Sequence, residues 1–222
     1  LFRSHSFPDH LYLLHLGDRF DQDIKPSTLP DNLHTLDLGR SFNQRINPKA
    51  LPKNLHSLYL GERFNREIKA NTLPDSLHTL ELGFKFNQEI QPNTLPKYAN
   101  TLYLSSNFNQ AIKPNVLPNT LRYLHFGCAY NTDIVPRTLP DSLTTVVLAR
   151  EFNKVIKPNV LPDTLHTLTF GKKFNREIKL LTLPNKLHTL EMGMEYNQAF
   201  KPNVLPDTLH TLTFGKKFNK EI

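Results

Sequence analysis

The residues with the most conspicuous chemistry are histidines that recur at one position, directly after a leucine: His34, His56, His78, His166, His188 and His210. On neighbouring strands of a parallel sheet their rings would lie ~4.8 Å apart, a spacing that suits a shared metal ion. Zinc requires three or four convergent ligands, and no column of cysteines or carboxylates accompanies the histidines. We therefore expect a repeated surface residue and no metal site.

Nucleophilic catalysis has one candidate, the single cysteine Cys128, which follows His125 by three residues. A catalytic cysteine needs a base and a pocket, and catalytic residues are unique by nature. Almost every Ser, His and Asp of this chain instead belongs to a repeated column, and no glycine-rich phosphate loop is present. The sequence predicts no catalytic residues, no cofactor and no enzymatic activity.

The elements that position these residues repeat every 22 residues without an insertion. An apolar residue followed by proline opens each unit, at residues 7, 29, 51, 73, 95, 117, 139, 161, 183 and 205. All 8 glycines share one column, and all 17 prolines fall in two columns. This regularity predicts one repeat array over residues 1–222 rather than separate domains.

The residue pattern within one unit predicts a short strand and a return path. In the segment LHTLDL at 33–38, Leu36 and Leu38 lie on the same face of an extended strand. Gly39 provides a turn that tolerates positive φ, and Phe42 and Ile46 point back inward. Prolines on both sides of the next leucine disfavour a helix. We predict a right-handed β-solenoid of ten coils, with one parallel sheet on its concave side and little or no α-helix.

Asparagines form a further column, interrupted only by Asp21: Asn43, Asn65, Asn87, Asn109, Asn131, Asn153, Asn175, Asn197 and Asn219. Asparagine is well suited to hydrogen bonds with nearby backbone groups. We expect a ladder that satisfies backbone groups in the turns rather than a recognition surface, because a binding surface should vary from coil to coil.

The segment LPDSLHTLELGFKFNQEIQPNTLP at 73–96 closely resembles the FNIP repeat, a leucine-rich-repeat relative named for its Phe-Asn and Ile-Pro residues. The resemblance covers the whole chain and implies a leucine-rich-repeat-like fold. FNIP repeats are abundant in social amoebae and in giant viruses that infect amoebae, where they often follow an F-box that docks onto a ubiquitin-ligase scaffold. The resemblance thus implies a substrate-recognition module. Phe2 and Ile222 already lie inside partial units, so we expect a fragment that lacks caps and any F-box.

Charge and hydropathy restrict the partners. The formal net charge is +7, but basic and acidic residues are interspersed, without an arginine-rich run or an aromatic-basic RNA-binding motif. No stretch approaches the ~20 apolar residues of a membrane span, and the start of the chain lacks the pattern of a signal peptide. We expect a protein partner, no nucleic acid, no membrane association, and a cytoplasmic location, which is the host cytoplasm if the protein is viral.

One outward column of the strands varies freely, and this suggests recognition. Thr167 and Thr169 resemble the threonine arrays of ice-binding solenoids, but the column of Thr169 varies too much from coil to coil to match an ice lattice. Coil five also departs most from the repeat, which can mark a functional site. Large and aromatic residues in coils three to six predict a partner contact on the concave sheet through Tyr59, Glu81, Phe84, Tyr103, Tyr123 and His125. The alternative is a scaffolding array in which these columns are unselected solvent positions.

Overall fold

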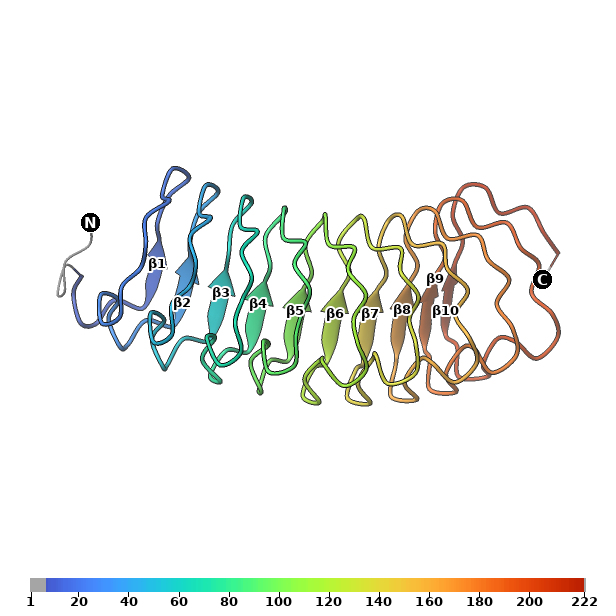
Figure 1. The fold of residues 1–222 in the computed structure, drawn as a ribbon. Helices are drawn as coiled ribbons and strands as arrows, with labels where there is room; N and C mark the ends of the chain where they lie inside the picture. The colour runs from blue at the N-terminus through green and yellow to red at the C-terminus, as the bar shows by residue number, and fades with distance from the viewer. Residues whose placement is uncertain (1–6, 222) are drawn as a thin grey trace.

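The computed structural model describes residues 7–221, and the expectations that rest on Phe2 and Ile222 lie outside these residues. Ten three-residue strands form one parallel sheet in the order of the chain, as Figure 1 shows. The strands are β1 (Leu13–His15), β2 (Thr35–Asp37), β3 (Ser57–Tyr59), β4 (Thr79–Glu81), β5 (Thr101–Tyr103), β6 (Tyr123–His125), β7 (Thr145–Val147), β8 (Thr167–Thr169), β9 (Thr189–Glu191) and β10 (Thr211–Thr213). No helix occurs in the described part of the chain, so the predicted β-solenoid is confirmed.

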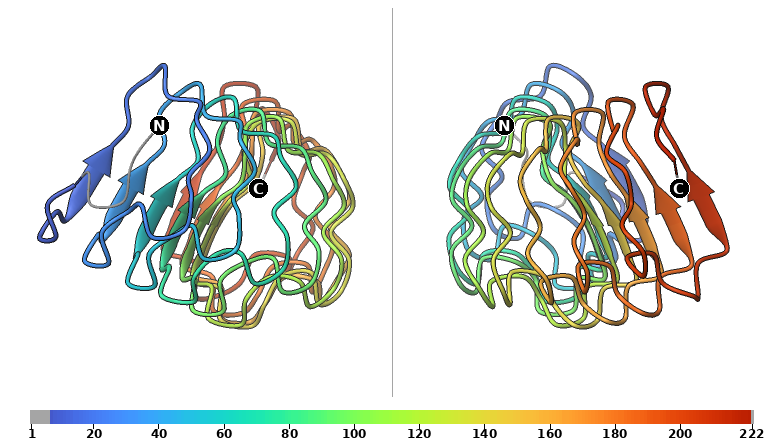
Figure 2. Two further views of the ribbon diagram at one scale, coloured as in Figure 1. Left: turned by 60° about the vertical axis from the view of Figure 1, so that its left-hand side comes forward. Right: turned by 90° about the vertical axis from the view of Figure 1, so that its right-hand side faces the viewer.

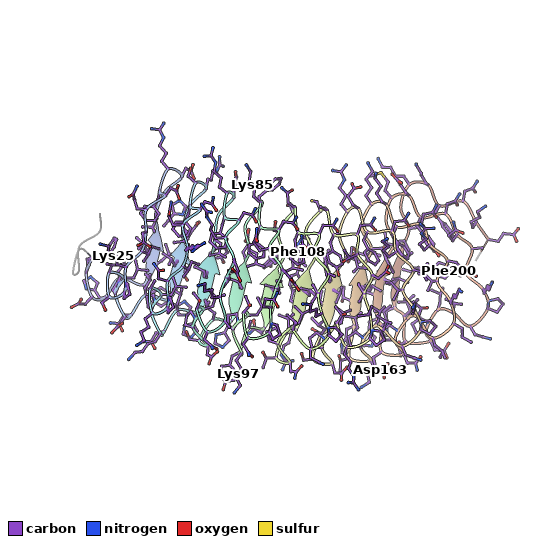
Figure 3. The ribbon with its side chains drawn as sticks, viewed as in Figure 1. Lys25, Lys85, Lys97, Phe108, Asp163 and Phe200 are labelled. Atoms are coloured by element: carbon purple, nitrogen blue, oxygen red, sulfur yellow. The ribbon has the colours of Figure 1, made fainter. Side chains whose placement is uncertain are left out.

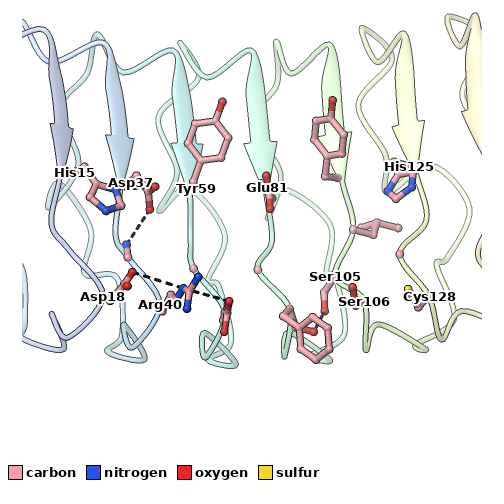
Figure 4. A pocket seen from close by; sticks show the side chains of 18 residues that line it. His15, Asp18, Asp37, Arg40, Tyr59, Glu81, Ser105, Ser106, His125 and Cys128 are labelled. Carbon is pink, nitrogen blue, oxygen red and sulfur yellow. Dashed lines mark hydrogen bonds and ion pairs between the residues drawn. The ribbon is translucent and has the colours of Figure 1, made fainter.

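The shape of the solenoid places the sheet on its inner curve. Both ends of the array lie further out on the strand side than its middle in the two views of Figure 2. In Figure 4 the strands descend in front of their return paths, and each new coil is added to the right. The solenoid is therefore right-handed, with a concave sheet and irregular turns on the outer side.

The core consists of columns of identical side chains stacked from coil to coil. Neighbouring strands pair without a shift, so that Leu36 lies opposite Leu58, and both are fully buried. Burial of such side chains contributes roughly 1.5–3 kcal/mol each. Charged side chains such as Lys85 and Lys97 project from the edges of the coils in Figure 3.

The Phe-Asn column provides a continuous stack of aromatic rings inside the solenoid. Successive rings lie 6.0 to 6.4 Å apart and within 12° of parallel, from Phe20 to Phe218. The prediction that Phe42 points inward is confirmed, since its side chain is fully buried. Because every ring contacts the ring of the next coil, an isolated unit would lose this contact on both sides.

The asparagine column forms the predicted ladder. The backbone N–H of Asn65 donates to Oδ1 of Asn43 at 3.0 Å, and that of Asn87 donates to Oδ1 of Asn65 at 2.9 Å. The same bond recurs at each step, from Asp21 at one end to Asn219 at the other. Each asparagine thus satisfies a backbone donor of the following coil.

Glycine fills the position after the strand in eight of the ten coils, the exceptions being Ser105 and Ala149, and it is favoured by the close approach of neighbouring coils as well as by conformation. Gly61 has φ +80°, and a Cβ there would lie 1.8 Å from the carbonyl oxygen of Gly39. Gly171 lies outside the left-handed region, yet its Cβ would lie equally close to the carbonyl oxygen of Ala149, at 1.8 Å. Backbone contact therefore operates in early and later coils alike, and the positive φ predicted for Gly39 is an additional reason in the early ones.

A left-handed position that the sequence analysis did not identify precedes each Leu-Pro pair by two residues. Its members have φ between 58° and 65°: Ser27, Lys49, Asn71, Asn93, Asn115, Arg137, Asn159, Leu181 and Asn203. Asparagine tolerates this region better than other side chains, which explains its frequency here. Leu181 is the exception that costs most, because a bulky side chain disfavours this backbone conformation.

Candidate functional site

The concave face contains a groove of about 680 Å³ that runs from β1 to β6, and Figure 4 shows it from close by. We call it the concave groove. Two columns form it, since each recurs once per coil and faces the same side. The first column holds the last residue of each strand: His15, Asp37, Tyr59, Glu81, Tyr103 and His125. The second holds the residue after the glycine position: Asp18, Arg40, Glu62, Phe84, Ser106 and Cys128.

Five of the six predicted contact residues line the concave groove: Tyr59, Glu81, Phe84, Tyr103 and His125. The sixth, Tyr123, opens strand β6 and does not line the groove, but its ring contacts that of Tyr103. Phe84 lies in the turn after β4 rather than on a strand and is 52% exposed. The structure thus gathers the predicted residues, but the groove also extends to coils one and two, beyond the predicted region.

An aromatic cluster closes the C-terminal end of the groove. The ring centroid of Tyr103 lies 5.3 Å from that of Tyr123 and 5.9 Å from that of His125. Burial raises the pKa of Tyr123, with a smaller contribution from Tyr103, and burial lowers the pKa of His125. His125 is consequently neutral near pH 7, so this end of the groove is aromatic and uncharged.

The opposite end of the groove is acidic, and most of its carboxylates have partners. Asp37 pairs with Nδ1 of His15 at 2.8 Å and accepts the backbone N–H of Gly39 at 2.8 Å. Arg40 lies between Asp18, at 3.6 Å, and Glu62, at 3.5 Å. These pairs give three of the four groove carboxylates a partner of opposite charge or a histidine.

Glu81 differs from these carboxylates because its side chain has no ion pair or hydrogen bond within residues 7–221. It lies between Tyr59 on β3 and Tyr103 on β5. Partial burial raises the pKa of Glu81, and the negative charge of Asp37 raises it further. The side chain remains exposed at the groove surface, so this carboxylate, which has no charged partner, can accept a cationic group.

The charge of the groove is opposite to that of the whole chain. The concave groove contains four carboxylates and one arginine, Arg40. Residues 1–111 hold twelve basic and eleven acidic side chains, whereas residues 112–222 hold fifteen and nine. Almost all of the net charge of +7 therefore belongs to the second half of the chain, away from the groove.

The histidine column lies outside the concave groove, and its first three members form a ring stack, whereas the rings of His166, His188 and His210 are tilted or edge-on to one another. His34 and His56 lie 4.1 Å apart and 8° from parallel, and His78 continues the stack at 5.1 Å. Burial lowers the pKa of His34, and the neighbouring charges of His56 and His78 lower it further. In the described part of the chain, no three His, Cys, Asp or Glu side chains are placed to hold a metal ion.

Several groove residues were not identified from the sequence. Asp37, Glu62 and Cys128 line the groove, although the sequence analysis treated the first as a variable position and the last as a disfavoured nucleophile. The signal available for Glu62 and Cys128 was the column after the glycine, which varies as freely as the last column of the strands, to which Asp37 belongs. Cys128 is exposed and unpaired with any other cysteine of the chain.

No helix in residues 7–221 is long and apolar enough to cross a membrane.

Comparison with known proteins connects this geometry to a family. The family model of the FNIP repeat matches five consecutive segments, residues 2–41, 42–85, 86–129, 130–173 and 174–217. Each segment spans about two coils, in agreement with the near identity of residues 159–178 and 203–222. A search of curated proteins gave no significant match.

Two solved structures resemble this chain to different degrees. CroV588, described as a novel circular leucine-rich-repeat protein, is 37% identical, with a TM-score of 0.62. The alignment covers 100% of this chain and 39% of CroV588, so this chain spans about two fifths of the length of that protein. YopM from Yersinia enterocolitica is 19% identical, with a TM-score of 0.42, over 94% of this chain and 60% of YopM. Leucine-rich-repeat-like arrays are typical protein-interaction scaffolds.

Proposed function

Since this chain belongs to the FNIP repeat family, we propose that it is a protein-binding module whose partner docks in the concave groove. The observation that supports this most directly is a groove lined by Tyr59, Phe84 and Tyr103 on a continuous sheet. Tyrosine side chains at the centre of a surface provide much of the binding energy in protein interfaces. A parallel sheet with stacked coils needs no folding step on binding, which lowers the entropic cost of association.

The partner that the family suggests is a substrate of a ubiquitin ligase, held in the cytoplasm for modification. The resemblance to repeats that follow an F-box supports this part of the proposal, and the catalytic step would belong to the ligase rather than to the array. The test is affinity purification of the full-length protein with quantitative mass spectrometry. Recovery of ubiquitin-ligase scaffold subunits is expected. A specific partner without those subunits would remove the ligase role and leave the binding module.

The placement of the site is tested by alanine substitution of Tyr59, Tyr103 and Tyr123. We expect each change to weaken partner binding by about 1 kcal/mol or more, because each removes an aromatic contact from the groove or its wall. Folding should be retained, since all three side chains point away from the core and are only half-buried. Tyr98→Ala is the matched control, because Tyr98 is 49% exposed and does not line the groove.

Two results would contradict this placement. Unchanged affinity in the triple alanine variant would remove the concave groove as the site. Loss of binding on substitution of Lys172, Lys173, Lys216 and Lys217 would place the partner on the basic C-terminal coils instead. If the chain is a scaffolding array, purification should recover only further copies of the protein, and sedimentation should show self-association.

A further inference from the structure

We propose that the concave groove selects a basic segment of its protein partner and seats one lysine or arginine side chain over Glu81, between the rings of Tyr59 and Tyr103. This inference rests on the proposed function, because it names the chemistry of the partner for the same groove. It follows from three independent observations: the order of the residues across the strands, the missing partner of Glu81, and the local charge.

The order of residues across three strands produces a site for a cation. Tyr59 lies opposite Glu81 in the pairing of β3 and β4, and Glu81 lies opposite Tyr103 in the pairing of β4 and β5. Adjacent strands are ~4.8 Å apart, so a cation above Glu81 lies roughly 5 Å to the side of each tyrosine column. Cation–π attraction operates within about 6 Å of a ring centroid. The carboxylate therefore attracts an ammonium or guanidinium group that lies within reach of both tyrosine side chains, and a ring whose face turns toward this group adds cation–π attraction.

The pairing of the other groove carboxylates isolates Glu81 as the group that needs a partner. Asp37 is paired with His15, and Arg40 serves both Asp18 and Glu62. In residues 7–221 the side chain of Glu81 has no such partner, and its pKa is raised chiefly by burial. An incoming cation gives the Glu81 carboxylate the charged partner that it lacks and favours its ionised form.

The charge distribution indicates a basic rather than an acidic partner. The groove has four carboxylates against one arginine, in the half of the chain that is nearly neutral. An acidic partner would be attracted to residues 112–222 instead, because this half of the chain contains fifteen basic and nine acidic side chains. Complementary potentials steer association and exclude wrong partners. A basic segment is thus the occupant that enters the groove rather than the C-terminal coils.

The walls of this site are held in place before binding. The ring of Tyr103 is packed against Tyr123 at 5.3 Å and His125 at 5.9 Å. Phe84 is exposed and lines the same groove as Glu81. The alkyl stem of a lysine or arginine packs favourably on such an apolar surface while its charged head remains at the carboxylate.

The test uses a phage-displayed library of random dodecapeptides selected on the purified chain, followed by fluorescence anisotropy with synthetic peptides. We expect the enriched peptides to share a lysine or arginine at a fixed position. Its replacement by glutamine should lower affinity at least tenfold. Glu81→Gln should lower the affinity of the original peptide to a similar extent. When the Glu81→Gln protein is combined with the glutamine-substituted peptide, affinity should be little lower than with either substitution alone.

Glu191→Gln is the matched control. Glu191 is also an exposed glutamate at the end of its strand, β9, but its neighbours on β8 and β10 are Thr169 and Thr213. We expect no loss of peptide affinity in this variant. Replacing the shared lysine or arginine of the peptide by glutamine tests the same contact without altering the protein. This measurement therefore decides the inference even if Glu81→Gln fails to fold.

The possible outcomes separate the inference from the proposed function. Peptides that lose binding on Tyr103→Ala but contain no shared basic residue, or that tolerate Glu81→Gln, would overturn the basic-segment inference and retain the groove as a binding site. Peptides that tolerate changes at both Tyr59 and Tyr103, or a selection that enriches no groove-binding peptide, would overturn the proposed function as well.

Discussion

The asparagine ladder leads to a quantitative prediction at Asn87, in the middle of the array. Its Oδ1 accepts the backbone N–H of Asn109 at 2.9 Å and Nε2 of Gln110 at 3.3 Å. Asn87→Ala removes the acceptor for both donors. A hydrogen bond contributes about 0.5–1.5 kcal/mol net, and water replaces part of the loss because Asn109 is exposed. We expect the free energy of unfolding to fall by about 1–2 kcal/mol.

Asn87→Asp is the matched variant, because the chain itself uses aspartate once in this column. Asp21 accepts the backbone N–H of Asn43 at 2.8 Å and Nε2 of Gln44 at 3.0 Å through the same oxygen. An aspartate at position 87 keeps this acceptor geometry. We expect it to remain within about 0.5 kcal/mol of the unchanged chain, the usual range for a tolerated surface change.

The assay combines urea denaturation, followed by circular dichroism, with hydrogen-exchange mass spectrometry. The local measurement is needed because repeat arrays unfold as coupled neighbouring units, and one weakened interface can divide the cooperative transition. Faster exchange in the peptide that contains Asn109 is expected for Asn87→Ala alone. Equal protection in both variants, or equal destabilisation by both, would refute the assignment of stability to the Oδ1 acceptor.

Three further predictions follow from strained or unsatisfied groups. Leu181→Asn should raise stability by about 0.5–1 kcal/mol in thermal melts, because φ is 63° at this position, where other coils use asparagine; an unchanged melting temperature would contradict this. Tyr196→Phe should raise the free energy of unfolding by about 1 kcal/mol, because the hydroxyl is buried without a hydrogen-bond partner among the described residues. The same burial raises the pKa of Tyr196 to about 12. Destabilisation by this change would contradict the view that the hydroxyl is unsatisfied. The pKa of Glu81 is raised in the folded state, so the folded state binds this proton more tightly than the unfolded state does, and the free energy of unfolding should fall as pH rises from 4.5 through the raised pKa. Thermal melts of Glu81→Gln over the same pH range should not show this fall. An identical pH profile in the two proteins would contradict the pKa shift.

The sequence by itself determined the solenoid, its ten coils and the contents of its core. The reason is that units adjacent in such an array must also be adjacent in space, so residue i contacts residue i+22. The stack at Phe42 and the ladder at Asn43 follow directly, because identical side chains then meet in register. The outward position of Tyr59 and Glu81 follows from strand alternation alone.

Only the tertiary structure decided which outward residues form one site. Curvature accumulates from small rotations between coils, and these rotations depend on side-chain packing that periodicity does not encode. The turn after each strand places the column of Phe84 in the same groove as the column of Glu81, and side-chain packing leaves Tyr123 outside the groove lining. Side-chain conformations in the folded chain likewise decide which carboxylates have partners. Asp37 pairs with His15, whereas Glu81 has no partner in the described residues.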